Sequence, residues 1–359
     1  MTRQINENRA VSQGRGNSSS TQDVESHGGE KSVPVNQRMK QLEMDLGAAE
    51  YRSKERPDDG RARNVYKARP LAGPLPKYNP SSISSATMEE VVSLLQIAFE
   101  HVAANKGAPG PDGQTIDQMR QHLPKTLERL SQDLLKGTYR PGTIRRVWIP
   151  KAGGGQRPLG IPNVVERTVA EAIRLVLEPL YEPKFSSHSH GFRPGRSCHT
   201  AIQAAAQYVE EGFDWVVDID LENFFNCVHH QRLLARLSET VSDSRILKVI
   251  HRMLKAEVVM PDDIAVKTEE GVPQGGPLSP LLSNVVLDEL DQELERRGHR
   301  FCRYADDLHV YVKSNRAGQR VMANLAKFVE KRLRLKVNRK KSAVDHPSER
   351  HFVGFSLVR

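Results

Sequence analysis

The chain of 359 residues carries a formal net charge of +9 and has a sequence pI of about 9.4. This length allows two or more domains with a sizeable core, and the basic excess favours a polyanionic partner. The three cysteines form no Cys-x-x-Cys pair, so the sequence suggests neither a zinc knuckle nor a disulfide scaffold, and this fits the reducing cytoplasm. The sequence has no apolar run of about 18 residues and no apolar signal core, so neither a membrane span nor secretion is expected.

Residues 1–85 form a predicted basic N-terminal extension. Gly, Ser, Asn and Gln dominate up to residue 37, and this composition predicts disorder because it cannot bury a core. A short helix is possible over about 35–56. An extended linker follows, with prolines at 70, 74, 76 and 80. The extension could grip RNA, but a solvated segment is the simpler interpretation.

The folded part is expected to begin near Thr87, where a capping box opens a helix that reaches about residue 102. A second helix is predicted over 118–136, and strands on either side of three glycines at 153–155 indicate a β-hairpin. Further helices are expected over 163–183, 199–211, 244–260, 279–297 and 317–333, an extended segment over 266–273 and a last strand over 351–357. Helices and antiparallel strands mixed without strict βαβ alternation predict the α+β class.

Two adjacent carboxylates, Asp306 and Asp307, lie between apolar segments that alternate as strands do. They are therefore expected at the tip of a hairpin, where aspartate tolerates turn geometry. Adjacent carboxylates repel each other unless a cation lies between them, and oxygen ligands suit Mg²⁺. The alternative is an ordinary Asp-Asp turn.

A second acidic strand is predicted over 215–221, with Asp218 and Asp220 two positions apart and so on one face. Two such strands can meet in one sheet and hold two metal ions about 3.5–4 Å apart, as in phosphoryl transfer. The alternative is a solvated edge strand followed by an Asp-capped helix. That alternative does not explain why the aspartates are embedded in apolar residues, where an unpaired charge is costly.

In order, the motifs match a palm-type polymerase, and over about 87–358 the chain resembles the reverse transcriptases encoded by bacterial group II introns. The motifs that carry the resemblance are 106–113, 149–151 with 157–162, 191–197, 220–225, 271–280, 304–307, 337–342 and 352–355. The resemblance implies a right-hand polymerase fold, with fingers over 86–213 and a palm over 214–359 whose antiparallel sheet packs on helices. The reverse transcriptase domain as a whole would span about 131–358.

The resemblance also implies that Asp220, Asp306 and Asp307 are the catalytic carboxylates. Asp220 and Asp306 would bridge two Mg²⁺ ions, for which Mn²⁺ could substitute, and the carbonyl of Leu221 would complete one shell. Asp307 would bind less directly. Such ions lower the pKa of the primer 3′-hydroxyl and neutralise the developing charge as pyrophosphate leaves.

The resemblance implies that several further residues bind the incoming dNTP or act on it. Lys151 and Arg157 would hold its triphosphate, although both could simply belong to an exposed basic turn. Gln274, before a helix N-terminus, would pack against the nascent base pair, with a plain turn as the alternative. Lys341 would protonate the departing pyrophosphate or bind the nucleic-acid backbone.

Phe225 would lie beneath the sugar of the dNTP and clash with a ribose 2′-hydroxyl, so DNA is the expected product; the alternative is a core phenylalanine, as is expected of Phe224. Arg193 and Arg196 would grip the template or order their loop. The histidines lack the His-x-x-x-His spacing of a helical zinc site, so no zinc is expected. Asp218 is expected to be structural.

The expected partners are an RNA template (group II intron RNA by the resemblance), a DNA or RNA primer and dNTPs; no oligomeric state is indicated. Asn226 and His190 depart from the usual Asp and Tyr of the family. The sequence ends after the last expected palm strand, so thumb, maturase and endonuclease functions are not expected. The rival functions are an RNA-dependent RNA polymerase, which Phe225 disfavours, and an RNA-binding splicing factor without strong catalysis, which the acidic triad disfavours.

Overall fold

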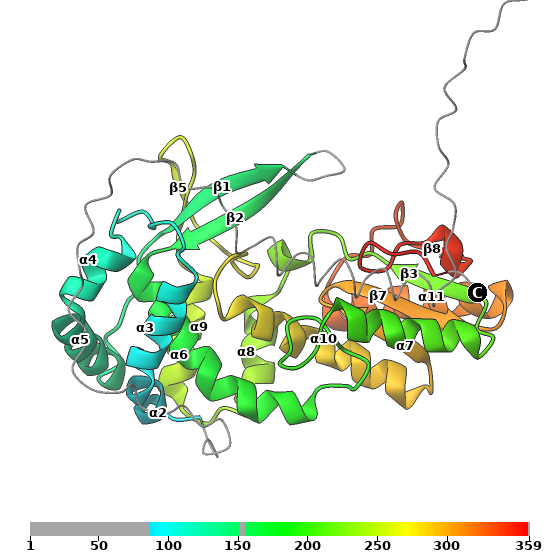
Figure 1. Cartoon of the computed structure of the whole chain (residues 1–359), viewed down its shortest axis with the longest axis horizontal. Helices are drawn as coiled ribbons and strands as arrows, with labels where there is room; N and C mark the ends of the chain where they lie inside the picture. Colours follow the sequence, from blue (N-terminus) through cyan, green and yellow to red (C-terminus); the bar gives the residue numbers. More distant parts are fainter. Residues whose placement is uncertain (1–85, 151–154, 358–359) are drawn as a thin grey trace, which may run out of the picture.

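The computed structural model describes residues 86–150 and 155–357. Its elements form two groups at opposite ends of an elongated molecule, with helices α8 and α10 between them (Figure 1). The expected helix within 35–56 and the candidate Lys151 lie outside the described residues. Among the described residues, no helix combines the length and the apolar character needed to cross a membrane.

Four helices open the described chain: α2 (Met88–Ser93), α3 (Leu95–Ala104), α4 (Ile116–Gln121) and α5 (Leu123–Leu135). The capping box is confirmed, because Thr87 and Glu90 exchange side-chain and backbone hydrogen bonds. The two expected continuous helices are each broken, at Leu94 and at His122. The second break has a clear cause, since Pro124 lacks an N–H and is tolerated only in the first turn of a new helix.

The first sheet has the strand order β2-β1-β4-β5. The hairpin of β1 (Ile144–Pro150) and β2 (Gln156–Pro162) is antiparallel, as expected, whereas β4 (Val258–Val259) pairs with β1 in parallel. The expected helix over 244–260 is therefore wrong beyond Leu254, where α9 (Ser244–Leu254) ends. Residues 258 and 259 form a strand because both are valines, which favour strands, and because β1 provides hydrogen-bonding partners for them.

The extended segment expected over 266–273 is a strand only at its start, in β5 (Ala265–Val266). The rest runs as a loop against 225–228, because Gly271 N donates to Val228 O and Val272 N donates to Phe225 O. Gly271 has a φ of +95°, and a Cβ there would lie 3.0 Å from the backbone of Asn226. Glycine is thus required by both the conformation and the close approach.

The remaining helices are α6 (Val164–Tyr181), α7 (Cys198–Glu210), α8 (His230–Ser238), α10 (Ser279–Arg296) and α11 (Asn315–Phe328), which continues as a π-helical turn, η4 (Val329–Leu333). Four of them agree with expectation within a few residues. Helix α8 was not expected, although buried Leu233 and Leu237 lie four residues apart, as on one face of a helix.

The second sheet has the order β6-β7-β3-β8 and is antiparallel throughout, as expected. Its strands are β3 (Trp215–Ile219), β6 (Arg300–Tyr304), β7 (Asp307–Val312) and β8 (Ala343–Asp345). Val217, Leu308 and Val310 on one face join the main core with α10 and α11. Val216 and Tyr311 on the other face pack with α7. Helices therefore cover both faces of the second sheet.

The last strand expected over 351–357 is wrong. Val353 and Gly354 both have positive φ, +52° and +83°, so the chain reverses direction there. Phe352 and Phe355 exchange backbone hydrogen bonds of 2.8 and 2.9 Å across this two-residue turn. The consequence is a tight turn that returns to the second sheet rather than a strand that extends it.

Candidate active site

A cleft of about 950 Å³ lies between the two sheets. The residues that line it come from many parts of the chain: Arg157, Pro158, Phe192, Asp220, Leu221, Glu222, Asn223, Phe224, Phe225, Asn226, Gln274, Asp306, Val337, Asn338, Arg339, Lys340 and Lys341. A second hollow of about 530 Å³ shares Arg157, Phe225 and Gln274 with the cleft and extends to Asn105 and Gly107. The two together offer room for a polymeric ligand.

Asp220 follows directly on β3 and is fixed through its backbone. Its N–H donates to Ser342 Oγ at 3.0 Å, and its carbonyl accepts from Asn338 N at 2.9 Å. Buried Leu221 pairs with Val337 in the same antiparallel crossing. Residues 336–342 therefore hold the end of β3, which leaves the carboxylate of Asp220 free to line the cleft. Nζ of Lys341 lies 3.8 Å from Asp220 Oδ2.

Asp306 lies in the two-residue turn between β6 and β7, since Tyr304 pairs with Asp307. It is half-buried in the cleft. Burial raises the pKa of Asp306, and the charge of Asp220 raises it further, although Arg157 and Arg303 oppose this. Asp220 and Asp306 therefore act on each other as like charges in one cleft. A cation between them would remove that repulsion.

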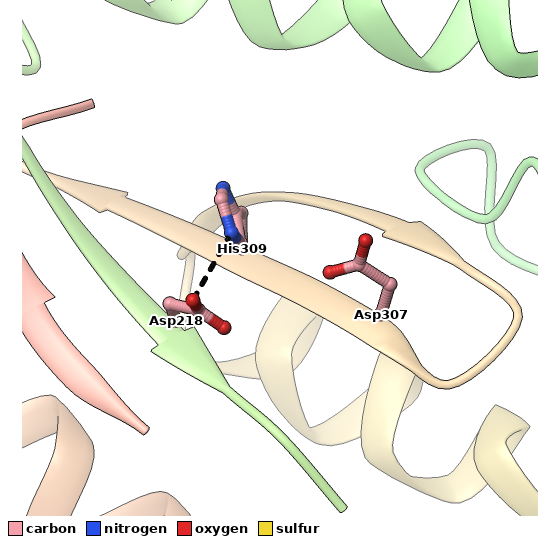
Figure 2. Close-up of side chains that lie close together, drawn as sticks. All are labelled: Asp218, Asp307 and His309. Carbon is pink, nitrogen blue, oxygen red and sulfur yellow. Dashed lines mark ion pairs between the residues drawn. The ribbon is translucent and has the colours of Figure 1, made fainter. Parts of the chain in front are cut away.

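Asp307 lies apart from the lining of the cleft. Figure 2 shows it beside His309 on β7, with Asp218 of β3 opposite. Asp307 Oδ2 accepts from Val353 N at 3.0 Å. Burial raises the pKa of Asp307, and the neighbouring His309 opposes the rise. Asp307 thus holds the turn at 353–354 against the sheet.

Asp218 and Asp220 do not share a site, although they were expected on one face. Asp218 accepts from Arg350 Nε and Nη2 at 2.9 and 2.6 Å, and His309 Nε2 lies 3.7 Å from its Oδ2. Burial alone would raise the pKa of Asp218, but His309 and Arg350 lower it. The strand ends at Ile219. Asp220 therefore lies outside the strand, and its side chain need not point to the same face as that of Asp218. The structural role expected for Asp218 agrees with these contacts.

Two sets of side chains could hold a divalent metal. In the cleft, Asp220 and Asp306 offer carboxylates, and Leu221 also lines it. Behind it, one ligand atom each of Asp218, Asp307 and His309 lie within 4.8 Å of one another. The cleft fits a metal better, because Arg350 already neutralises Asp218. Two-metal phosphoryl transfer uses carboxylates that stay open to substrate, and of these two sets it is the one in the cleft that meets this condition.

The expected nucleotide-binding residues that the structure describes gather in the cleft. Arg157 is exposed on β2, and Lys341 lies beside Asp220. Gly160 N donates to Gln274 O at 2.7 Å, so the first sheet fixes the turn before α10. Phe224 is buried in the core, as expected, whereas the half-buried ring of Phe225 lines the cleft.

The two arginines proposed for the template differ in their environments. Arg193 is buried, and its guanidinium donates to the carboxylate of Glu182 and to the carbonyls of Ser186 and Ser189. Its donors are therefore used within the loop, which favours the alternative of ordering that loop. Arg196 is half-buried and donates to Ser187 O at 2.6 Å. The other N–H groups of the Arg196 guanidinium remain available to donate to a ligand.

Sequence reasoning missed two contributors to the cleft. Phe192 is 45% exposed and lines the cleft beside Arg157. Ser342 fixes the backbone of Asp220, yet it lies 122 residues away along the chain. An exposed aromatic within a Gly-Phe-Arg-Pro loop is a usable signal for Phe192. No local pattern indicates the role of Ser342.

Comparisons with known proteins agree with this geometry. The family model described as reverse transcriptase (RNA-dependent DNA polymerase) matches residues 149–357, more than half of the chain. Protein YkfC of Escherichia coli (strain K12) is 33% identical over 299 residues, which cover 71% of this chain and 78% of YkfC. Group II intron-encoded protein LtrA of Lactococcus lactis subsp. cremoris is 28% identical over 327 residues, which cover 73% of this chain and 54% of LtrA.

The chain therefore spans about half the length of the intron-encoded relative. Among solved structures, a partial Cas6-RT-Cas1–Cas2 complex is similar with a TM-score of 0.43 and 22% sequence identity. The match covers 69% of this chain and 43% of the chain in that complex.

Proposed function

Because the chain belongs to the reverse transcriptase family, we propose that its cleft is the active site of an RNA-directed DNA polymerase of the group II intron type. The observation that supports this most directly is the meeting of Asp220 and Asp306 in one cleft. Asp220 follows the end of β3 and Asp306 lies in the turn between β6 and β7, and the charge of Asp220 raises the pKa of Asp306.

We propose two Mg²⁺ ions in this cleft, with Mn²⁺ as a substitute, held by Asp220, Asp306 and the carbonyl of Leu221. When bound, such ions would lower the pKa of the primer 3′-hydroxyl and neutralise charge on the transferred phosphate. Asp307 supports the site less directly: its carboxylate binds Val353 N and so fixes the neighbouring turn. Asp307 is not among the residues that line the cleft, which favours a supporting role over direct ligation.

The side chains around the carboxylates would handle the nucleotide. Arg157 offers a cation for the triphosphate from the first sheet, opposite the second sheet. The ammonium of Lys341, which lies 3.8 Å from Asp220 Oδ2, would give a proton to the leaving pyrophosphate. The ring of Phe225 would limit the room for a sugar 2′-hydroxyl. Gln274, whose carbonyl is held by Gly160, would border the new base pair.

The proposed partners are an RNA template, a DNA or RNA primer and dNTPs. The net charge of +9 supports binding of nucleic acid. The exposed side chains of Arg339 and Lys340 line the cleft, and exposed Arg334 and Lys336 precede them in the same segment; these would meet the nucleic-acid backbone. Group II intron RNA is proposed as the template because LtrA is an intron-encoded protein. The same basic segment supports a second candidate, a splicing role on intron RNA with weak catalysis.

Primer extension with the variant Asp306→Asn tests the proposed function. Wild-type protein should extend oligo(dT) on poly(rA) with dNTPs and Mg²⁺, and the variant should lose more than about a hundredfold in rate. Binding of the primer–template, measured by anisotropy, should change little. The substitution keeps the size of the side chain, so thermal unfolding should remain close to that of the wild type.

Three outcomes would reject the proposal in different ways. Undiminished extension by Asp306→Asn would show that the cleft is not the active site. Extension with rNTPs in preference to dNTPs would indicate an RNA polymerase. Wild-type protein that binds intron RNA tightly without extending a primer would favour the splicing role.

A further inference from the structure

A buried arginine lies beneath the turn that carries Asp306. Arg303 of β6 is 1% exposed, and its Nε and Nη2 donate to the two carboxylate oxygens of Asp291 at 2.7 and 2.5 Å. Asp291 lies on α10 and is fully buried. Nη1 of Arg303 donates to Ala305 O at 2.8 Å and to Asn284 Oδ1 at 3.0 Å. The guanidinium thus joins α10 to the turn itself.

The turn at Ala305 needs such support. Ala305 has a φ of +56°, in the left-handed region that side chains other than glycine enter at a cost. The two-residue turn Ala305-Asp306 has positive φ at its first position, where hairpins normally use glycine. A bond from Arg303 to the carbonyl of Ala305 fixes the peptide that leads into Asp306. The direction of the carboxylate depends on that peptide.

The same cluster also contacts the loop that carries Phe192, another residue of the cleft lining. Asn284 Nδ2 donates to Gly191 O at 3.0 Å, and the backbones of His188, His190 and Arg303 exchange two hydrogen bonds. These contacts tie the loop that carries Phe192 to the turn that carries Asp306. Arg303 and Asn284 are therefore shared by two walls of the cleft.

We propose that Arg303, held by Asp291 and Asn284, is a positioning residue that sets the direction of Asp306; the inference rests on the proposed polymerase function. A role of Arg303 in overall stability alone explains these contacts less well. A buried ion pair is often no more stabilising than apolar residues of similar size. A purely structural pair would also have no need to bind the strained turn through a third donor.

The test uses Arg303→Lys, which keeps the charge but loses the planar fork. In single-nucleotide incorporation, kcat should fall at least tenfold and the Mg²⁺ concentration for half-maximal rate should rise. The KM for dNTP should stay within about twofold, because Arg157 and Phe225 are not disturbed. Adding Ala305→Gly to this variant should restore about fivefold in kcat, since glycine adopts positive φ without strain.

Two further variants complete the design. Asn284→Ala removes one acceptor of Arg303 while leaving the Asp291 pair, and it should lower kcat severalfold even if Arg303→Lys does not fold. Arg296→Lys is the matched control, because Arg296 makes a two-bond pair with Glu293 on the exposed side of the same helix. Its kinetics should equal those of the wild type. Thermal unfolding of every variant reports on the fold.

The inference is overturned if folded Arg303→Lys keeps the wild-type kcat and Mg²⁺ requirement. It is also overturned if adding Ala305→Gly to Arg303→Lys restores none of the lost kcat. In that case the loss of kcat comes from lower overall stability and not from a displaced turn. A wild type without polymerase activity would contradict the proposed function instead. In that case Mn²⁺ binding, followed by electron paramagnetic resonance, decides the point: Arg303→Lys should weaken it at least severalfold, and unchanged binding refutes the positioning role.

Discussion

Replacing Gly191 by alanine should displace the turn that carries Asp306. A Cβ at position 191 would lie 2.2 Å from Ala305 N and 2.9 Å from Tyr304 C, both backbone atoms. Relieving these contacts requires the loop and the turn to separate by about 1 Å, and a misplacement of about 1 Å at a reacting group can cost about 100-fold in rate. The overpacking should lower the free energy of unfolding by about 1–3 kcal/mol.

The assay is steady-state incorporation of a single dNTP, with unfolding by urea measured in parallel. Ser189→Ala is the matched control, because Ser189 is fully buried in the same loop and its hydroxyl has no hydrogen-bond partner among the described residues. That variant should keep both activity and stability. A folded Gly191→Ala protein with wild-type kcat would refute the reasoning, since it would show that the turn tolerates displacement.

Two further predictions concern the sugar and the pH. Phe225→Ala should raise incorporation of rNTPs relative to dNTPs by at least about tenfold, as competition between the two substrates would reveal; an unchanged ratio would mean that the ring only packs. Asp288 is the second case: burial, with help from the charge of Asp291, raises its pKa to about 6. The folded protein therefore binds this proton more tightly than the unfolded chain, and stability should fall as pH rises from about 4 to 6. After allowance for solvent screening, the loss is about 1–2 kcal/mol. Asp288→Asn should remove it, so the difference between the two proteins in urea unfolding must change between pH 4.5 and 7, and parallel curves would contradict the assignment.

The strands that carry the acidic residues could be predicted because their signals are local. Alternation around Asp307 and the apolar run before Asp220 each fix a strand, and both appear where expected. The capping box at Thr87 fixed a helix start in the same way. The interactions that stabilise each of these elements are between residues close in sequence, so the local sequence is sufficient to predict the element.

The errors arose where distant partners decide the structure. Val258 pairs with Ile144, and without that partner the segment continues the helical pattern of α9. The direction of Asp307 depends on the register of β7 with β3, which sets His309 opposite Asp218, and on the turn at Val353, whose N–H binds the Asp307 carboxylate. Membership of a two-carboxylate motif does not reveal which carboxylate lines a cleft. That choice is made by tertiary contacts with Arg350 and Val353.

During synthesis of this chain, Asp220 is made well before the segment 336–342 that fixes its backbone. Ser342, which binds the N–H of Asp220, follows 122 residues later; at about 5–20 residues per second, its synthesis takes roughly 6–24 s more. During that interval Arg157 and Phe192 have already been synthesised. Under the proposed function, nucleotide transfer would have to wait until 336–342 has folded back along the end of β3. The proposed polymerase would thus encounter its template before it could copy it.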